Sequence, residues 1–142
     1  MTADQAPQKP IPVADQASAP WFEAAKQHRL LLQRCDDCDA YRFPAWPRCD
    51  NCWSINWHWA TASGKGTVFS YVVHHAPKVP GRTLPFVIAL VELEEGVRML
   101  GELRGIDASD VKIGLPVRAT YLDFPDSDVS PAWSLYAWEV TA

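Results

Sequence analysis

The sequence predicts a mainly β protein in which a short helix and a small metal-binding ribbon precede a five-stranded barrel. Two observations lead to this prediction. The four cysteines of the chain form two Cys-x-x-Cys pairs separated by ten residues, a spacing that is typical of a metal-binding ribbon. Beyond residue 64, segments that alternate with a period of two follow one another between turns containing Gly or Pro, which is typical of strands.

The 142 residues give room for one ordinary domain and a small module. Residues 1–20 predict a flexible, Pro-rich tail, because Pro, Ala, Gln and Asp dominate and little apolar surface can be buried. We expect the helix and the zinc ribbon within residues 21–60. The barrel is expected within residues 61–142.

Residues 21–28 predict a short amphipathic helix, because apolar positions recur at the spacing of one helix face. Ser18 is placed to cap this helix, and Pro20 is acceptable in its first turn. Residues 30–32 are three leucines, which we interpret as a buried strand leading into Cys35. The residues on the predicted helix face are Trp21, Ala24, Ala25 and His28.

Two Cys-x-x-Cys turns can direct four thiolates at one tetrahedral metal ion, a geometry that favours Zn²⁺. The predicted ligands are Cys35, Cys38, Cys49 and Cys52. Iron in a rubredoxin-like site is one alternative, because ligand softness does not separate the two metals, and disulfides or free thiols are another. Four thiolates saturate tetrahedral zinc, so the site is expected to be structural. Arg34, Arg42 and Arg48 are near enough in sequence to offset its negative charge.

The residue after each cysteine pair is expected to adopt a positive φ, which Gly adopts most easily. Asp39 and Trp53 occupy these two positions. Asp tolerates this conformation, whereas Trp does so poorly. The sequence therefore predicts that the second metal-binding turn is distorted or wider than the usual form.

Residues 41–59 are rich in aromatic side chains for so short a segment. We expect these rings to form the core of a module that is too small to build one from aliphatic residues. The alternative is an exposed surface for a partner or a ligand. The bulky residues of this region include Phe43, Pro44, Trp46, Pro47, Trp53, Trp57 and Trp59.

The C-terminal half is expected to contain five strands, with a capped helical turn at residues 107–110 between the third and the fourth. Gly101 inside the third strand suggests a bulge or a barrel bend. Five strands and one short helix in this order are the ingredients of an OB-fold barrel. The predicted strands are Thr67–His75, Phe86–Glu94, Val97–Arg104, Leu115–Phe124 and Trp133–Val140.

Composition argues against several classes of protein. The chain is 48% hydrophobic and 21% charged, as is usual for a globular protein. No apolar run is long enough to cross a membrane, and the first residues do not form a secretion signal, so we expect a cytoplasmic protein. A net charge of −4 makes nucleic acid an improbable ligand, because nucleic-acid binders usually carry a basic surface.

The loop 76–85 is the best candidate for contact with a ligand or a partner, because its prolines lower the entropy cost of ordering it. Lys78 and Arg82 in this loop could meet phosphates or carboxylates, although an ordinary loop with two solvated charges is the plainer interpretation. His74 and His75 point to opposite faces of one strand and cannot act as a pair. No catalytic motif is found, and no catalytic residue is predicted.

Several segments in order along the chain together resemble the DUF35 family, whose members join a rubredoxin-like zinc ribbon to an OB-fold. The resemblance covers roughly residues 21–122. Asp39 and Trp53 depart from it, because the family usually has Gly there. The matching segments are Trp21–Ala25, Leu32–Cys38, Phe43-Pro44, Cys49–Cys52, Gly64–Val68, Val91–Gly96 and Ile113–Val117.

The resemblance implies a non-catalytic accessory subunit of a thiolase-superfamily enzyme that acts on acyl-CoA in thiolysis, aldol cleavage, condensation or acyl transfer. The catalytic residues would then belong to the partner, and acyl-CoA could lie at the shared interface. Two other functions stay open at this point. One is an independent acyl-CoA-binding protein or thioesterase, and the other is an OB module that binds single-stranded nucleic acid through stacking aromatic side chains.

Overall fold

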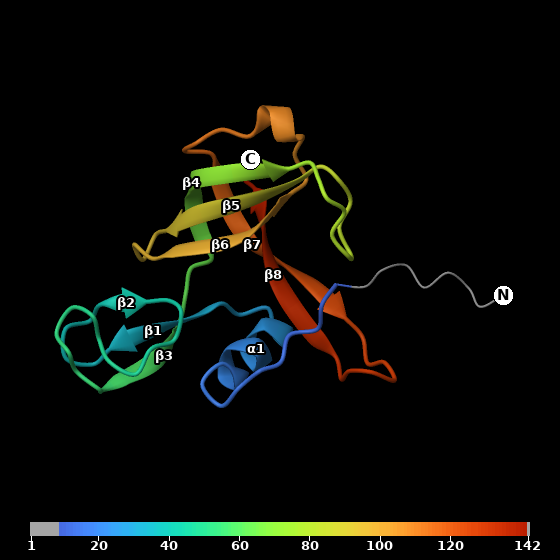
Figure 1. Cartoon of the computed structure of the whole chain (residues 1–142). Coiled ribbons are helices and arrows are strands. Elements are labelled where there is room, and N and C mark those ends of the chain that lie inside the picture. Colours follow the sequence, from blue (N-terminus) through green and yellow to red (C-terminus); the bar gives the residue numbers. More distant parts are fainter. Residues whose placement is uncertain (1–8, 142) are drawn as a thin grey trace.

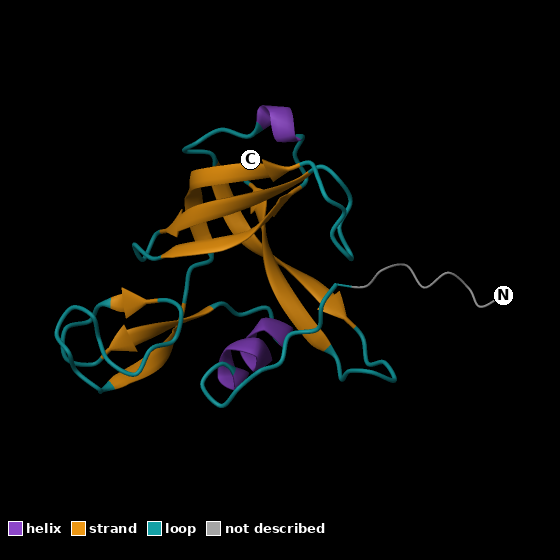
Figure 2. Ribbon diagram, viewed as in Figure 1, coloured by secondary structure: helices purple, strands orange, loops and turns teal. Residues whose placement is uncertain are grey.

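The computed structural model describes residues 9–141 of the chain. A small three-stranded sheet and a short helix lie at one end of the molecule, and a closed barrel lies at the other (Figure 1). Strands make up most of the regular structure (Figure 2). The predicted mainly β fold, with a ribbon ahead of a barrel, is therefore confirmed.

The ribbon is built from three antiparallel strands in the order β2-β1-β3. The leucine run forms a strand that ends on the first cysteine, as the sequence predicts. Leu32 is completely buried in it. The strands are β1 (Leu31–Cys35), β2 (Tyr41–Arg42) and β3 (Trp57–Thr61).

The barrel contains five strands, closed in the order β4-β5-β6-β8-β7. All of its pairs are antiparallel except β6 with β8, which is parallel and covers Leu103 and Arg104 on β6. The helical turn η1 (Ala108–Asp110) lies between β6 and β7, without the predicted side-chain cap. This arrangement confirms the OB-fold. Its strands are β4 (Lys65–His74), β5 (Phe86–Leu93), β6 (Arg98–Arg104), β7 (Pro116–Phe124) and β8 (Trp133–Val140).

One continuous cluster of buried residues joins the helix, the ribbon and the barrel. Trp138 is its largest fully buried side chain. Trp21 on the helix packs edge-on against Tyr136 of β8, with ring centroids 5.6 Å apart. The helix is thus held on the β7–β8 pair, which extends past the rest of the barrel (Figure 1).

Gly101 does not mark a bulge, because it pairs regularly with Ala89 on the neighbouring strand. The irregularity of the barrel lies instead in β4, between Val68 and Ser70. A Cβ atom on Gly101 would lie 2.8 Å from Nε1 of Trp138. Gly is therefore required at this position because a tryptophan crosses directly over the backbone.

The helix α1 (Ala19–Lys26) ends earlier than predicted. Ser18 occupies the N-cap position, but its hydroxyl donates to Asp15 Oδ1 and does not cap the helix. His28 lies beyond the helix, with a φ of 56°. It is therefore not a residue of the helix surface, which corrects the sequence prediction.

The N-terminal segment lies against the barrel from residue 9 onward. Lys9 Nζ is 3.2 Å from Glu102 Oε2 on β6, and both side chains are largely buried. Val13 is 94% exposed, so an apolar side chain in this segment does not by itself indicate burial. The first eight residues of the predicted tail lie outside the described residues.

Candidate metal centre and ligand surfaces

The two metal-binding turns have the same backbone geometry. The amide of Asp39 donates to the carbonyl of Cys35, and the amide of Trp53 donates to that of Cys49. Both residues adopt the expected positive φ, at 61° and 65°. The predicted distortion of the second turn is therefore wrong, because the Trp53 backbone adopts the conformation while its side chain extends into solvent, with 73% of its surface exposed.

The four cysteine sulfurs converge on one point, and all lie within 4.8 Å of one another. The Sγ atoms of Cys35 and Cys52 are 3.6 Å apart, as are those of Cys38 and Cys49. Around a tetrahedral ion with Zn–S bonds of roughly 2.3 Å, neighbouring sulfurs stand roughly 3.8 Å apart. The cluster thus has the dimensions and the donor set of a tetrahedral four-thiolate metal site.

No disulfide joins the four cysteines in this structure, and their paired sulfurs are 3.6 Å apart, well beyond the S–S bond length of roughly 2.05 Å. A hydrogen bond with the Asn51 side chain is the main cause that lowers the pKa of Cys38. The Ser54 backbone N–H favours the thiolate of Cys52, but desolvation and the other three cysteines raise the pKa of that thiol to about 12. A cation at the centre would favour all four thiolates, so metal binding and proton release are coupled here.

The three arginines near the cysteines bind different partners. Arg34 Nε is 3.7 Å from Asp39 Oδ1. Arg48 Nη1 donates to the carbonyl of Trp53 over 3.2 Å. Arg42 Nη2 donates to the carbonyl of Trp46 over 3.0 Å. The guanidinium groups of Arg42 and Arg48 thus hold backbone carbonyls in and beside the loop 35–52.

The aromatic residues of the ribbon divide into two groups. Trp57 and Trp59 pack edge to face, with centroids 5.1 Å apart, and both are partly buried. Trp46 and Trp53, in contrast, are 65% and 73% exposed. The expectation of a purely structural core therefore holds for the first pair and fails for the second, whose side chains are exposed on the module's surface.

Lys78 and Arg82 both line a hollow in the loop 76–85. Arg82 Nε is 3.1 Å from Glu102 Oε2, and its guanidinium lies 5.0 Å from the centroid of Phe86. Glu102 therefore joins Arg82 to Lys9 of the N-terminal segment. A ligand of Arg82 would have to compete with this carboxylate.

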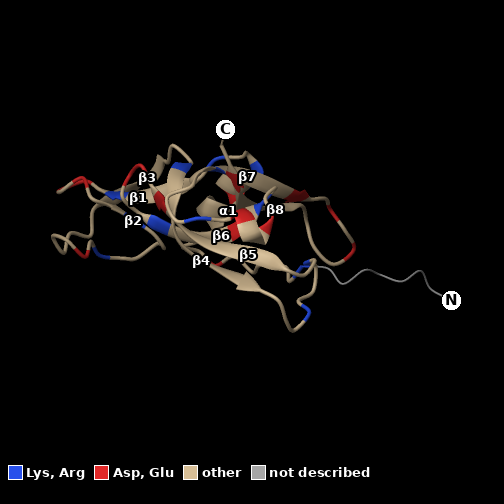
Figure 3. Cartoon of the chain, turned by 90° about the horizontal axis from the view of Figure 1, so that it is seen from above, with Lys and Arg blue, Asp and Glu red and all other residues tan. Residues whose placement is uncertain are grey.

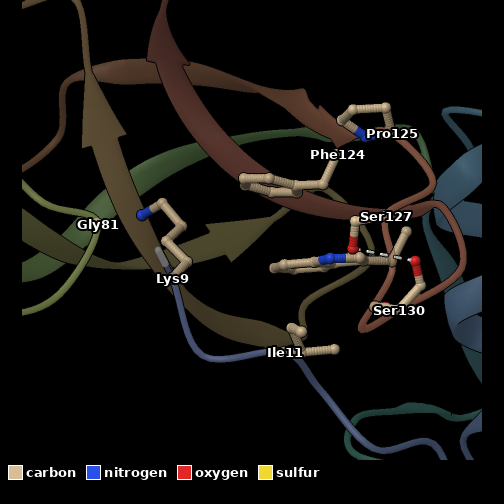
Figure 4. A pocket seen from close by; sticks show the side chains of 8 residues that line it. Lys9, Ile11, Gly81, Phe124, Pro125, Ser127 and Ser130 are labelled. Carbon is tan, nitrogen blue, oxygen red and sulfur yellow. Dashed lines mark hydrogen bonds between the residues drawn. The ribbon is translucent and has the colours of Figure 1, made fainter. Parts of the chain in front are cut away.

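A second hollow lies between the N-terminal segment and the turn after β7 (Figure 4). Its walls include Ile11 and the rings of Phe124 and Trp133, which stack with centroids 4.1 Å apart. Ser127 and Ser130 close the turn through a hydrogen bond. No sequence pattern indicates this hollow, because Ile11 and Phe124 in its walls are more than one hundred positions apart.

One polar cluster joins a histidine, an aspartate and a serine. His28 Nε2 is 2.9 Å from Asp123 Oδ2, and Ser134 Oγ donates to Asp123 Oδ1 over 2.5 Å. The carboxylate stands between the other two groups, so the imidazole does not contact the hydroxyl as a base would. The His28 ring also stacks on Tyr121. The cluster therefore attaches the segment after α1 to the arm formed by β7 and β8.

We expect Asp123→Asn to weaken this attachment slightly. Ser134 first, and then His28, hold the pKa of Asp123 below its usual value. A carboxyl group whose pKa is lowered by folding stabilises the folded chain above its unfolded pKa of about 3.9, and this stabilisation is lost as the pH falls through the folded pKa. Because the side chains of His28 and Asp123 are half exposed, the variant should melt only about 2 °C below the wild type at neutral pH. Thermal melts at decreasing pH should show this difference shrinking in acid; a constant difference would contradict the interpretation.

His74 and the turn residue Asp126 have structural roles. His74 stacks on Phe86 and contacts the carbonyl of Pro77 over 2.7 Å, so it helps to hold the loop 76–85. Asp126 Oδ1 accepts a hydrogen bond from the amide of Ala132 within the turn after β7.

Acidic and basic segments are interspersed along the described chain (Figure 3). Within residues 9–141 no helix is long and apolar enough to cross a membrane.

The chain matches two family models in succession. The rubredoxin-like zinc ribbon domain of ChsH2 matches residues 22–57, and the C-terminal OB-fold domain of ChsH2 matches residues 59–122. Among solved structures, the "Ltp2-ChsH2(DUF35) aldolase" aligns with a TM-score of 0.81 and 40% identity, covering 92% of this chain and 98% of that one. A DUF35 protein from Sulfolobus solfataricus shares the fold, with a TM-score of 0.60 and 19% identity.

Curated relatives fall into two groups. The 3-oxo-4,17-pregnadiene-20-carboxyl-CoA hydratase alpha subunit of Mycobacterium tuberculosis is 57% identical over 90% of this chain, which spans 39% of that protein's length. A DUF35 domain-containing scaffold protein of Methanocaldococcus jannaschii is 37% identical over 71% of this chain and 73% of its own length. These matches cover both the ribbon and the barrel. The chain therefore belongs to the DUF35 family and carries the ChsH2 form of its zinc ribbon and OB-fold.

Proposed function

We propose that this chain is a non-catalytic accessory subunit of an enzyme that acts on acyl-CoA, and that its partner is a thiolase-superfamily protein. The observation that carries the proposal is the alignment with the Ltp2-ChsH2(DUF35) aldolase, which covers nearly all of both chains. The hydratase relatives are more than twice as long as the aligned region. Because the neighbour that this chain covers almost completely is named an aldolase, aldol cleavage by the partner is the first reaction to test.

The structure also supports the proposal that the catalytic residues belong to the partner. The four cysteines converge as metal ligands, and four thiolates leave no open coordination position for a substrate. Among the described residues, the cluster of His28, Asp123 and Ser134 has its carboxylate in the middle and does not place a base beside a nucleophile. We therefore assign no catalytic residue to this chain.

Zinc is the metal that we propose for the four-cysteine site, with Cys35, Cys38, Cys49 and Cys52 as its ligands. The sulfur spacing fits it, and its contribution would be structural. We further propose that the tail, ribbon and barrel divide near residues 20 and 60, close to the start of α1 at Ala19 and the end of β3 at Thr61. We also propose that the complex is cytoplasmic, and that Lys78 and Arg82 face the acyl-CoA or the partner subunit.

The decisive experiment is to purify the chain from its own host and to identify the bound proteins by mass spectrometry. We expect a thiolase-like protein in fixed stoichiometry. Acyl-CoA cleavage should require both subunits, because one supplies the catalytic groups and the other maintains the assembly.

The control is the isolated chain, tested for acyl-CoA turnover by thiol release and for acyl-CoA binding by calorimetry. Turnover or tight binding by the chain alone would favour the independent function. A partner enzyme that is equally stable and active without this chain would overturn the accessory role.

A further inference from the structure

Arg42 at the end of β2 is buried without a full set of partners. Its residue surface is 8% exposed, and its Nη2 donates to the carbonyl of Trp46. Its Nε and Nη1 atoms form no hydrogen bond with any described residue, cysteine sulfurs included, and no carboxylate in residues 9–141 forms an ion pair with it. Its guanidinium carbon also lies 6.0 Å from the centroid of the Trp57 ring, a contact that supplies no counter-ion. A buried guanidinium in this state is costly unless an anion compensates its charge.

A small hollow in the ribbon surface lies beside this guanidinium and measures about 190 Å³. Arg48, which is exposed and forms no ion pair with the described residues, borders the same hollow. Two guanidinium groups and one carboxylate thus give it a positive character. It is smaller than the pockets of roughly 300–1,000 Å³ that enclose drug-sized molecules, so it suits a side chain better than a whole cofactor. Its lining residues are Arg42, Phe43, Pro44, Trp46, Arg48 and Asp50.

Trp46 forms one wall of this hollow and is held from both sides. Its amide donates to Oε1 of Gln33 over 2.9 Å, and its carbonyl accepts from Arg42. Gln33 and Arg42 are both buried, so the backbone of Trp46 is fixed while its side chain is 65% exposed. An aromatic side chain on a fixed backbone loses little freedom on binding, which is the property of an interface anchor.

We propose that this hollow receives an Asp or Glu side chain of the partner subunit, with Trp46 packing beside it on the partner's apolar surface. Arg48, whose Nη1 donates to the carbonyl of Trp53, would bind the carboxylate directly through its remaining N–H donors. The buried positive charge of Arg42, which also lines the hollow, would strengthen the attraction of the carboxylate. This inference rests on the proposed function and deepens it, because it names the docking surface and the chemistry that the surface recognises.

Calorimetry between the chain and its co-purified partner tests the docking surface. Arg48→Gln and Trp46→Ala should each weaken binding by about tenfold or more, as expected for central anchors. Two matched controls should change the affinity less than about twofold. Arg118→Gln removes an exposed arginine that is paired with Glu139. Trp53→Ala removes a tryptophan that is 73% exposed, compared with 65% for Trp46, and that does not line the hollow. Unchanged binding by Arg48→Gln and Trp46→Ala would overturn the proposal.

A second measurement does not depend on the partner. The full chain is titrated with N-acetylglutamate and, separately, with inorganic phosphate, while the indole signal of Trp46 is followed by NMR. A saturable shift with N-acetylglutamate that disappears in Arg48→Gln is expected, and it would support the carboxylate site even if the purification showed no enzyme partner and the accessory role failed. A shift with phosphate alone, or with neither anion, would overturn the proposal.

Discussion

Removal of the metal from the four-cysteine site is expected to unfold at least the loop 35–52 while the barrel remains folded. Between residues 35 and 52 the buried residues are Cys35, Arg42 and Cys49, so this loop has almost no apolar core of its own. Structural zinc in small modules contributes apparent binding energies of roughly 10–16 kcal/mol, all of which act on folding. Cys49→Ser should therefore lose its metal, its ordered ribbon and its affinity for the partner together.

Metal content by mass spectrometry, together with amide NMR spectra before and after chelation, would test this expectation. The amides of β4–β8 serve as the internal control, because most residues of the buried cluster lie on these barrel strands. The same measurement of metal content decides between zinc and iron. An unchanged melting temperature and metal content in Cys49→Ser would refute the assignment of Cys49 as a ligand.

Trp138→Ala is expected to destabilise the chain by about 3–5 kcal/mol, the usual cost of removing a large buried aromatic side chain. Trp138 is completely buried, and it packs against Tyr136 with centroids 5.4 Å apart. It also lies across Gly101, where β6 leaves room for the indole ring. Because domains of this size are stable by only about 5–15 kcal/mol, much of the folded population should be lost.

Urea denaturation would measure this difference. Trp53→Ala is the matched control, since the same side chain is removed from a position that is 73% exposed, and it should change the stability by less than about 0.5 kcal/mol. If the two variants lost similar stability, the assignment of Trp138 as a major stabilising side chain of the core would be wrong.

The sequence by itself determined the features that depend on neighbouring residues. Alternation and turn residues located all five barrel strands to within two residues at each end, because the side-chain period of a strand is local. The spacing of Cys35 and Cys38, and of Cys49 and Cys52, likewise indicated the sulfur cluster that the structure contains. Trp53 was predicted to adopt an unfavourable φ and does so.

The tertiary structure decided the features that depend on contacts between distant segments. The reason for Gly101 is visible only when Trp138 crosses it, and the role of His28 depends on Asp123, which is 95 positions away. The unpaired guanidinium of Arg42 is likewise a property of packing, since its burial and its missing partners cannot be read from its neighbours in sequence. Strand periodicity is fixed by the local backbone, whereas charge pairing and close approach follow from the register in which distant strands meet.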